Sequence, residues 1–386
     1  MNKEDVYSLL VYIGMIAIAF VVGFCVLQPA ITEGLLFDNQ GILIGYTLAS
    51  IVVGILVNVL LMELGHVIGA LVGGYEVISF NVLGFCIYKV SSDKKTKWKF
   101  KFPRNADGLA GETIISPKTE KANPMFYVFM PLVFILLECV AMYCVFMFIP
   151  DYIGESATLE NPLNWLKYGV IIVATIACMF CLYNYFPAKI DSTTDGYRLT
   201  LLTKKINVEA YNEYLRILSN NLIESPEETF KTFDELTDFT AKVNMLTVYN
   251  EILNKEYINA LVLLDKIIES KSVSKSTKLD AKIQKSYIYF VSKPVAEAKD
   301  YFIEAFKGDD KRYVVGCSSF MALRTYLLFA GLWQQSKSEV EFCLSKKKKC
   351  IERTNPGLLK VEETLFNEAL EIVKKSGLVF EEKKKK

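Results

Sequence analysis

Residues 58–70 read NVLLMELGHVIGA and lie inside an apolar stretch, Ile42–Val72, that only Glu63 and His66 interrupt. A helix of this length crosses a hydrocarbon core of about 30 Å. Glu63 and His66 are three residues apart and Met62 and His66 are four apart, so all three side chains share one helix face. Ionisable side chains are costly inside a membrane, which makes Glu63 and His66 candidate functional residues.

Three further apolar stretches predict membrane spans, at Tyr7–Leu27, Met125–Ile149 and Tyr168–Pro187. The 386 residues are 52% hydrophobic with a mean hydropathy of +0.26, which is more apolar than an ordinary soluble protein. No small-residue cleavage site follows the first stretch and further spans do, so we expect it to be retained rather than removed as a signal peptide. The sequence therefore predicts a mainly α-helical, polytopic membrane bundle of four spans.

The loops between the predicted spans differ in charge. Residues 30–41 and 150–166 contain acidic residues but no Lys or Arg. The loop between the second and third spans is basic, with Lys89, Lys94, Lys95, Lys97, Lys99, Lys101, Arg104, Lys118 and Lys121. By the positive-inside rule this loop and both termini are cytoplasmic, and we expect a multi-pass protein of the plasma membrane. Richness in Lys, Ile and Asn is typical of a bacterial source with a low-GC genome.

Composition excludes several classes of function. The 44 basic and 43 acidic residues nearly cancel, so no overall field predicts a nucleic-acid partner. The nine cysteines lack the spacing of a disulfide framework or a zinc ribbon. His66 is the only histidine in the chain, which excludes any mechanism that needs two.

Residues 201–386 are more polar and predict a cytosolic helical domain. Segments near Ala260, Ala298 and Val340 are alike and about 40 residues apart, a spacing typical of paired helices stacked as a tetratricopeptide-like solenoid. Pro226 and Pro294 fall at expected helix starts. An irregular helical bundle is the alternative. Either architecture predicts a surface for a protein partner and contains no catalytic cluster.

Two lysine runs, Lys346–Lys349 and Lys383–Lys386, lie in this cytosolic half. Such runs are usually solvated faces or ends of a domain. The alternative is attraction to anionic lipid on the cytoplasmic leaflet.

A second motif follows the fourth span, where residues 184–197 read NYFPAKIDSTTDGY. Together, the Glu63–His66 stretch and this segment make the chain resemble the site-2 protease family of intramembrane zinc metalloproteases. That family carries His-Glu-x-x-His on a membrane helix, often continuing Leu-Gly-His, and a later span supplies Asn-x-x-Pro followed by Asp-Gly. Residues 63–66 match the first motif, and the second is matched by Asn184, Pro187, Asp195 and Gly196.

The resemblance covers about residues 42–200 and implies a domain organisation. Residues 1–40 would be an extra N-terminal transmembrane helix with its external loop. Residues 41–200 would be the site-2-protease-like core, including a loop able to form a membrane-associated sheet between the second and third spans. Residues 201–386 would be the helical-repeat domain.

The resemblance also implies the chemistry of the site. Glu63 would be the catalytic base, and His66 and Asp195 would bind Zn²⁺. Asn184 and Pro187 would hold the backbone of a membrane-spanning protein or peptide substrate. The motifs assign no role to the polar residues Asn58 and Glu138 within the predicted spans.

Met62 departs from the family pattern, because it occupies the position of the first histidine. A thioether is a weak ligand for Zn²⁺, so one imidazole and one carboxylate leave fewer than the three protein ligands of a catalytic zinc site. A cysteine is an alternative ligand, and Cys178 and Cys181 lie in the fourth span. The sequence therefore makes zinc binding doubtful in this chain.

Several functions remain open at this stage. The first is an intramembrane metalloprotease that is impaired by Met62, either naturally or because methionine replaces the histidine of a working enzyme. The second is a pseudoprotease that binds or assembles membrane helices without cutting them. A third is a membrane scaffold whose helical repeats carry the function. The simplest structural alternative is that Glu63 and His66 form a polar pair that fixes helix packing.

Overall fold

The computed structural model describes residues 3–380 except 34, 37–38, 83–84, 93–94, 102–110, 120, 151–161, 191–193 and 220–230. The chain divides into two compact units, Met1–Val208 and Glu209–Lys386, and each is treated by itself below.

The first unit contains four helical segments that are long and apolar enough to cross a membrane, as the sequence predicted. The segments are α1 (Lys3–Val22) continued by the π-helical turn η1 (Gly23–Leu27) and α2 (Gln28–Thr32), then α3 (Gln40–Val72), α4 (Pro124–Phe148) and α5 (Pro162–Asn184). In the second unit, α12 (Gly308–Val315) and α13–η2 (Phe320–Leu328 and Phe329–Trp333) are long and apolar enough to cross a membrane only when taken together, and the pair is bent by 87°. The protein is thus a mainly helical membrane protein.

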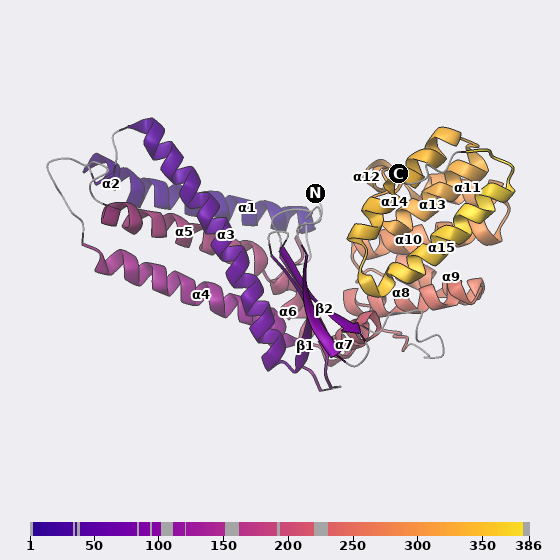
Figure 1. The fold of residues 1–386 in the computed structure, drawn as a ribbon, viewed down its shortest axis with the longest axis horizontal. Helices are drawn as coiled ribbons and strands as arrows, with labels where there is room; N and C mark the ends of the chain where they lie inside the picture. Colours follow the sequence, from indigo (N-terminus) through magenta and orange to yellow (C-terminus); the bar gives the residue numbers. More distant parts are fainter. Residues whose placement is uncertain are drawn as a thin grey trace. The chain divides into compact units, whose positions relative to one another are not determined.

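Local signals fix the ends of the spans. The side chain of Asn39 accepts hydrogen bonds from the first turn of α3, and Asn123 caps α4 immediately before Pro124. In Figure 1, α3 crosses α4 and α5 within the first unit. Glycine allows the closest approach: a Cβ at Gly65 would lie 2.5 Å from the Cα of Pro131.

The loop between α3 and α4 forms an antiparallel sheet, and the resemblance implied that this loop could form one. Strands β1 (Tyr75–Val82), β2 (Phe85–Ser92), β3 (Lys95–Lys101) and β4 (Glu112–Pro117) pair in the order β3-β2-β1-β4. The register places Ser79 opposite Tyr88 on β2 and opposite Ile114 on β4. A turn at Gly74, whose φ is +85°, joins α3 to β1, so the sheet begins at the end of the helix that carries Glu63 and His66.

Two further helices, α6 (Asp195–Leu202) and α7 (Lys205–Ser219), follow α5. The described remainder of the second unit is helical. Its helices are α8 (Asp238–Leu253), α9 (Tyr257–Glu269), α10 (Lys275–Ser292), α11 (Val295–Ala305), α12, α13, η2, α14 (Lys337–Arg353) and α15 (Pro356–Lys375). Serine and threonine side chains cap several of them, as Thr237 does at α8 and Ser274 at α10.

The repeated pattern in the sequence corresponds to equivalent structural positions. Ala260, Ala298 and Val340 each occupy the fourth residue of a helix, α9, α11 and α14 respectively, and all three are completely buried. Pro294 is the N-cap of α11, as predicted, whereas Pro226 lies outside the described residues. The predicted run Lys346–Lys349 lies on α14, and Lys383–Lys386 also lies outside the described residues.

A buried polar network ties four of these helices together. The guanidinium of Arg324 on α13 donates to Glu362 on α15 at 2.8 Å and to Gln284 on α10 at 2.5 Å. The hydroxyl of Tyr249 on α8 donates to Glu362, and Arg324 lies 4.1 Å from the ring centroid of Tyr287. The charge of Arg324 is compensated by Glu362, and Nε and Nη2 of its guanidinium are hydrogen-bonded, whereas Nη1 has no hydrogen-bond partner among the described residues. Pairing of the two charges allows the network to be buried in the core of the second unit.

Candidate functional site

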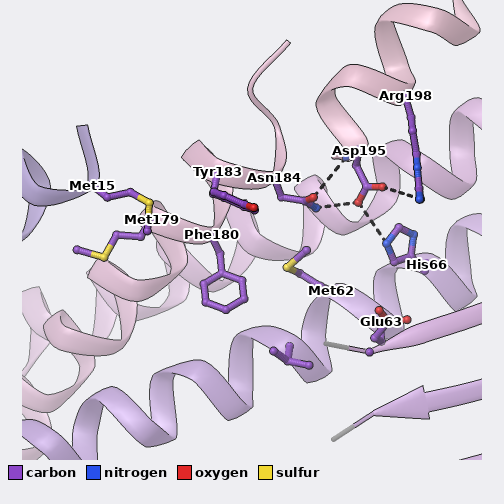
Figure 2. Close-up of a pocket in the computed structure, with 12 residues that line it drawn as sticks. Met15, Met62, Glu63, His66, Met179, Phe180, Tyr183, Asn184, Asp195 and Arg198 are labelled. Carbon is purple, nitrogen blue, oxygen red and sulfur yellow. Dashed lines mark hydrogen bonds and ion pairs between the residues drawn. The ribbon is translucent and has the colours of Figure 1, made fainter. Parts of the chain in front are cut away.

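Residues from both sequence motifs meet at one place in the first unit. The imidazole Nε2 of His66 on α3 lies 3.3 Å from Oδ2 of Asp195 at the start of α6, and both side chains are buried. Asn184 at the end of α5 and Glu63 on α3 line the same cavity (Figure 2). The residues that the resemblance singled out therefore lie together.

Asp195 is held from three sides. Besides His66, Asn184 donates from Nδ2 to Oδ2 at 2.7 Å and accepts from the backbone N–H of Asp195 at 3.3 Å. Arg198, one turn later on α6, contributes Nη1 at 3.4 Å from Oδ1. Burial by itself raises the pKa of Asp195, but the positive charges of His66 and Arg198 outweigh burial and lower it. The carboxylate is thus ionised, and both of its oxygens have hydrogen-bond or ion-pair partners.

A close backbone approach explains the glycine of the second motif. A Cβ at Gly196 would lie 2.3 Å from the carbonyl carbon of Tyr185, so only glycine allows α6 to begin against the turn that follows Asn184. Pro187 lies in that turn and is absent from the described cavity lining. Its predicted contact with substrate remains a prediction.

Both ring nitrogens of His66 face hydrogen-bond acceptors. Nδ1 lies 3.0 Å from the backbone carbonyl of Tyr127 on α4, and Nε2 faces the carboxylate of Asp195. A carbonyl and a carboxylate cannot donate, so only an imidazolium ring can make both hydrogen bonds. A protonated His66 would supply a positive charge beside Asp195.

The sheet orients Glu63. The hydroxyl of Thr113 on β4 donates to Oε2 of Glu63 at 2.6 Å, and the hydroxyl of Tyr127 donates to the carbonyl of Thr113 at 2.9 Å. The backbone of Gly111 also lies against Glu63, because a Cβ there would be 2.2 Å from the glutamate Cγ. The position of the Glu63 carboxylate is therefore fixed by β4 and by the residue that precedes it.

The site opens into a cavity of about 540 Å³ between α1, α3 and α5. One end carries Glu63, His66, Asn184, Asp195 and Arg198, and the other is apolar, with Met15, Val59, Met179, Phe180 and Tyr183. Met62 lies between the two ends (Figure 2). An apolar cavity with a few convergent polar groups is the usual form of a binding site.

The donor set does not fit a catalytic zinc ion. It offers one imidazole, one carboxylate and the thioether of Met62, and the described residues contain no group of three or more His, Cys, Asp or Glu placed to hold a metal. Replacement of the missing ligand by cysteine finds no support. Neither Cys178 nor Cys181 belongs to the described cavity lining, and the Cys178 thiol is hydrogen-bonded to Cys139 on α4.

The sequence did not reveal several residues of the site. Thr113 contacts Glu63, the carbonyl of Tyr127 contacts His66, and Arg198 contacts Asp195. Met15 and Met179 line the cavity. Of these residues, only Arg198 could have been found from the sequence, because it follows Asp195 by three residues and residues three apart on a helix are neighbours. The contacts of Thr113 and Tyr127 depend on sheet register and helix packing, which the sequence pattern does not specify.

Comparisons with known proteins add no relatives: neither protein-family models, nor curated proteins, nor solved structures give a match to this chain. The resemblance to site-2 proteases therefore rests on the two motifs alone.

Proposed function

We propose that this protein is a site-2-protease-like membrane protein that binds a membrane-spanning polypeptide segment in the cavity beside His66 without cutting it through zinc chemistry. The observation that carries the proposal is the donor set of the cavity, in which His66 and Asp195 are joined by the thioether of Met62 in place of a third strong zinc ligand. With Arg198 and Glu63, which line the same cavity, a protonated His66 and Asp195 make a site of two positive and two negative groups.

Convergence of the two motifs supports the first part of the proposal. His66 and Asp195 are more than a hundred residues apart in the chain, yet their side chains are in contact. Asn184 and Gly196, the other members of the second motif, each have a structural reason to be there. A polar pair that only fixed helix packing would not require Glu63 to be oriented separately by Thr113.

Charge balance supports the second part. His66 and Arg198 place two positive charges against Asp195, which is the electrostatic role of a divalent cation at such a site. A metal would have to displace these contacts and would gain only a thioether as its third protein ligand. Both costs oppose zinc binding.

A metalloprotease impaired by Met62 is the second candidate. The orientation of Glu63 favours it, because a hydrogen-bonded carboxylate beside the metal position is what the base of such an enzyme needs. In this candidate, a histidine at position 62 would restore the third ligand without any other change.

The second unit is proposed to recruit a protein partner on the cytoplasmic side of the plasma membrane. Its helices pack as successive antiparallel pairs, and Ala260, Ala298 and Val340 recur at equivalent buried positions. These features support a tetratricopeptide-like array, an architecture that presents extended binding surfaces. A scaffold that acts only through this unit is the competing interpretation, and it predicts that the cavity is dispensable.

Site-specific photocrosslinking tests the proposal. A photoreactive residue at Met179 faces the cavity, and one at Leu137 on the lipid-exposed side of α4 is the matched control. In native membranes, we expect Met179 to capture an intact membrane-spanning polypeptide that Leu137 does not capture. Equal capture from both positions, or capture of fragments cut within their span, would contradict the proposal.

A further inference from the structure

Two polar residues inside the membrane-spanning helices have no part in the site described above. Asn58 on α3 is completely buried, and Glu138 on α4 is 6% exposed. Burying an amide and a carboxylate in a membrane is unfavourable unless their hydrogen bonds are made. Their presence therefore requires a structural or functional reason.

Helix packing places the two residues at the same level. Gly65 on α3 packs against Pro131 on α4, and the two helices are antiparallel. Asn58 lies seven residues before Gly65, and Glu138 lies seven residues after Pro131. Seven residues are close to two full turns, or about 10 Å, so each residue keeps the interface face of its helix. Helix geometry therefore predicts that Asn58 and Glu138 face each other across the α3–α4 interface.

Three oxygen atoms of these two side chains lack a hydrogen-bond donor. The amide Nδ2 of Asn58 donates to the carbonyl of Gly54 on its own helix at 2.8 Å. Its Oδ1 and both carboxyl oxygens of Glu138 have no hydrogen-bond partner among the described residues. All three atoms are acceptors when Glu138 is ionised, so the missing component is a donor.

We propose that Glu138 and Asn58 form a proton-binding site within the membrane, in which the carboxylic acid of Glu138 donates a hydrogen bond to Oδ1 of Asn58. One proton removes the buried negative charge and pairs two of the three unsatisfied oxygens. Asn58 lies one helical turn before Met62, so the pair fixes the part of α3 that enters the cavity. This role does not depend on zinc or on a bound polypeptide.

The titratable group beside Glu138 among the described residues is the thiol of Cys139 on the same helix. Cys139 follows it on α4, and Cys178 and Cys181 on α5 lie next to Cys139. A thiol does not carry a compensating positive charge, so these neighbours favour an uncharged Glu138.

Infrared spectroscopy of the full chain in lipid at pH 7 tests this proposal. Every protein compared, the otherwise unsubstituted one included, carries Asp280→Asn, because burial raises the pKa of Asp280 in the second unit to about 7 and its carboxylic acid would add a band of its own. We expect the carbonyl band of a protonated carboxylic acid in the unsubstituted protein, sensitive to deuterium exchange. Glu138→Gln should remove the band, whereas Tyr143→Phe, on the lipid-exposed side of the same helix, should leave it unchanged. Asn58→Leu should shift the band to higher frequency, because the acid loses its acceptor.

Glu138→Gln should also keep the unfolding temperature close to that of the unsubstituted protein, since its amide can still donate to Asn58. Absence of the band from the unsubstituted protein, or its persistence in Glu138→Gln, would overturn the proposal. So would loss of the band on adding sodium chloride at constant pH, which would identify the ligand as a sodium ion. If Glu138→Gln does not fold, the unsubstituted protein and Asn58→Leu decide the outcome.

Discussion

Each unit of the protein contains a buried acid–base cluster, and the two clusters differ in what surrounds them. Arg324 and Glu362 in the second unit are 0% and 3% exposed and are enclosed by side chains of four helices. His66 and Asp195 in the first unit are almost as deeply buried, at 8% and 6%, yet they line a cavity of about 540 Å³. Burial and ion pairing alone therefore do not distinguish a structural cluster from a candidate binding site, whereas an adjoining cavity does.

The two clusters also act differently on their nearest aspartate. His66 and Arg198 lower the pKa of Asp195 against the effect of burial. Near the second cluster, burial raises the pKa of Asp280 to about 7; Lys242 opposes this shift and the negative charge of Glu362 adds to it. Positive charges thus outweigh burial at Asp195, whereas burial outweighs the charge of Lys242 at Asp280.

The largest effect is expected from breaking the structural cluster. Arg324→Met should destabilise the second unit by about 3–5 kcal/mol, because Glu362 is left as an uncompensated buried charge. Thermal unfolding of the full chain followed by circular dichroism would measure this loss. The double variant Arg324→Met with Glu362→Met is the control and should recover most of the stability. Equal losses in the single and double variants would show that packing, not charge, is responsible.

A smaller effect is expected at the turn that positions Asp195. Gly196→Ala should cost about 1–3 kcal/mol, because the new Cβ has no room beside Tyr185 and α6 must move. Gly23→Ala is the matched control, since nothing described lies within 4 Å of its new Cβ. Unfolding temperatures of both variants in lipid nanodiscs would test this, and similar shifts for the two variants would contradict the proposed close approach.

Asp280 predicts a pH dependence of the second unit. Its raised pKa means that it contributes stability below its ordinary pKa, and that this contribution is lost as the pH rises through about 7. Asp280→Asn should therefore be more stable than the unsubstituted protein at pH 8, by about 1–2 kcal/mol, and similar to it at pH 4. Chemical unfolding at both pH values measures the difference, and an equal effect at both values would contradict the shift.

The smallest effect is expected from Arg198→Gln. The arginine side chain is 33% exposed and pairs with Asp195 over a single turn, so its loss should cost less than about 1 kcal/mol. The unfolding temperature is the measurement, with Arg216→Gln, which loses a similar pair with Glu213, as the control. A loss of several kcal/mol would show that Arg198 stabilises the site far more than its exposure allows.

Much of the first unit could be predicted from its sequence. The four spans follow from long apolar stretches, and the convergence of His66 with Asp195 follows from the two motifs. The hydrogen bond from Thr113 to Glu63 could not be predicted, because it depends on which residue of β4 the sheet register brings to α3. Arg198 was overlooked although its spacing from Asp195 is local.

In the second unit, the similar segments near Ala260, Ala298 and Val340 predicted paired helices, and in the structure these three residues occupy equivalent buried positions. The sequence pattern could not predict the pairing of Arg324 with Glu362, since charged residues on amphipathic helices normally face solvent and their partner is set by tertiary packing. The helical character of the second unit was therefore accessible from the sequence, whereas the polar network that joins its helices was not.

The most direct test of the account is the zinc content of the purified full chain beside its Met62→His and Met179→His variants. The account predicts that the unsubstituted protein binds no stoichiometric zinc. It predicts the same for Met179→His, which places a histidine in the cavity but away from the motif. About one zinc per chain in Met62→His alone would show that Met62 is what separates this site from a metal centre. Stoichiometric zinc in the unsubstituted protein would contradict the central claim that His66 and Asp195 pair with each other in place of a metal.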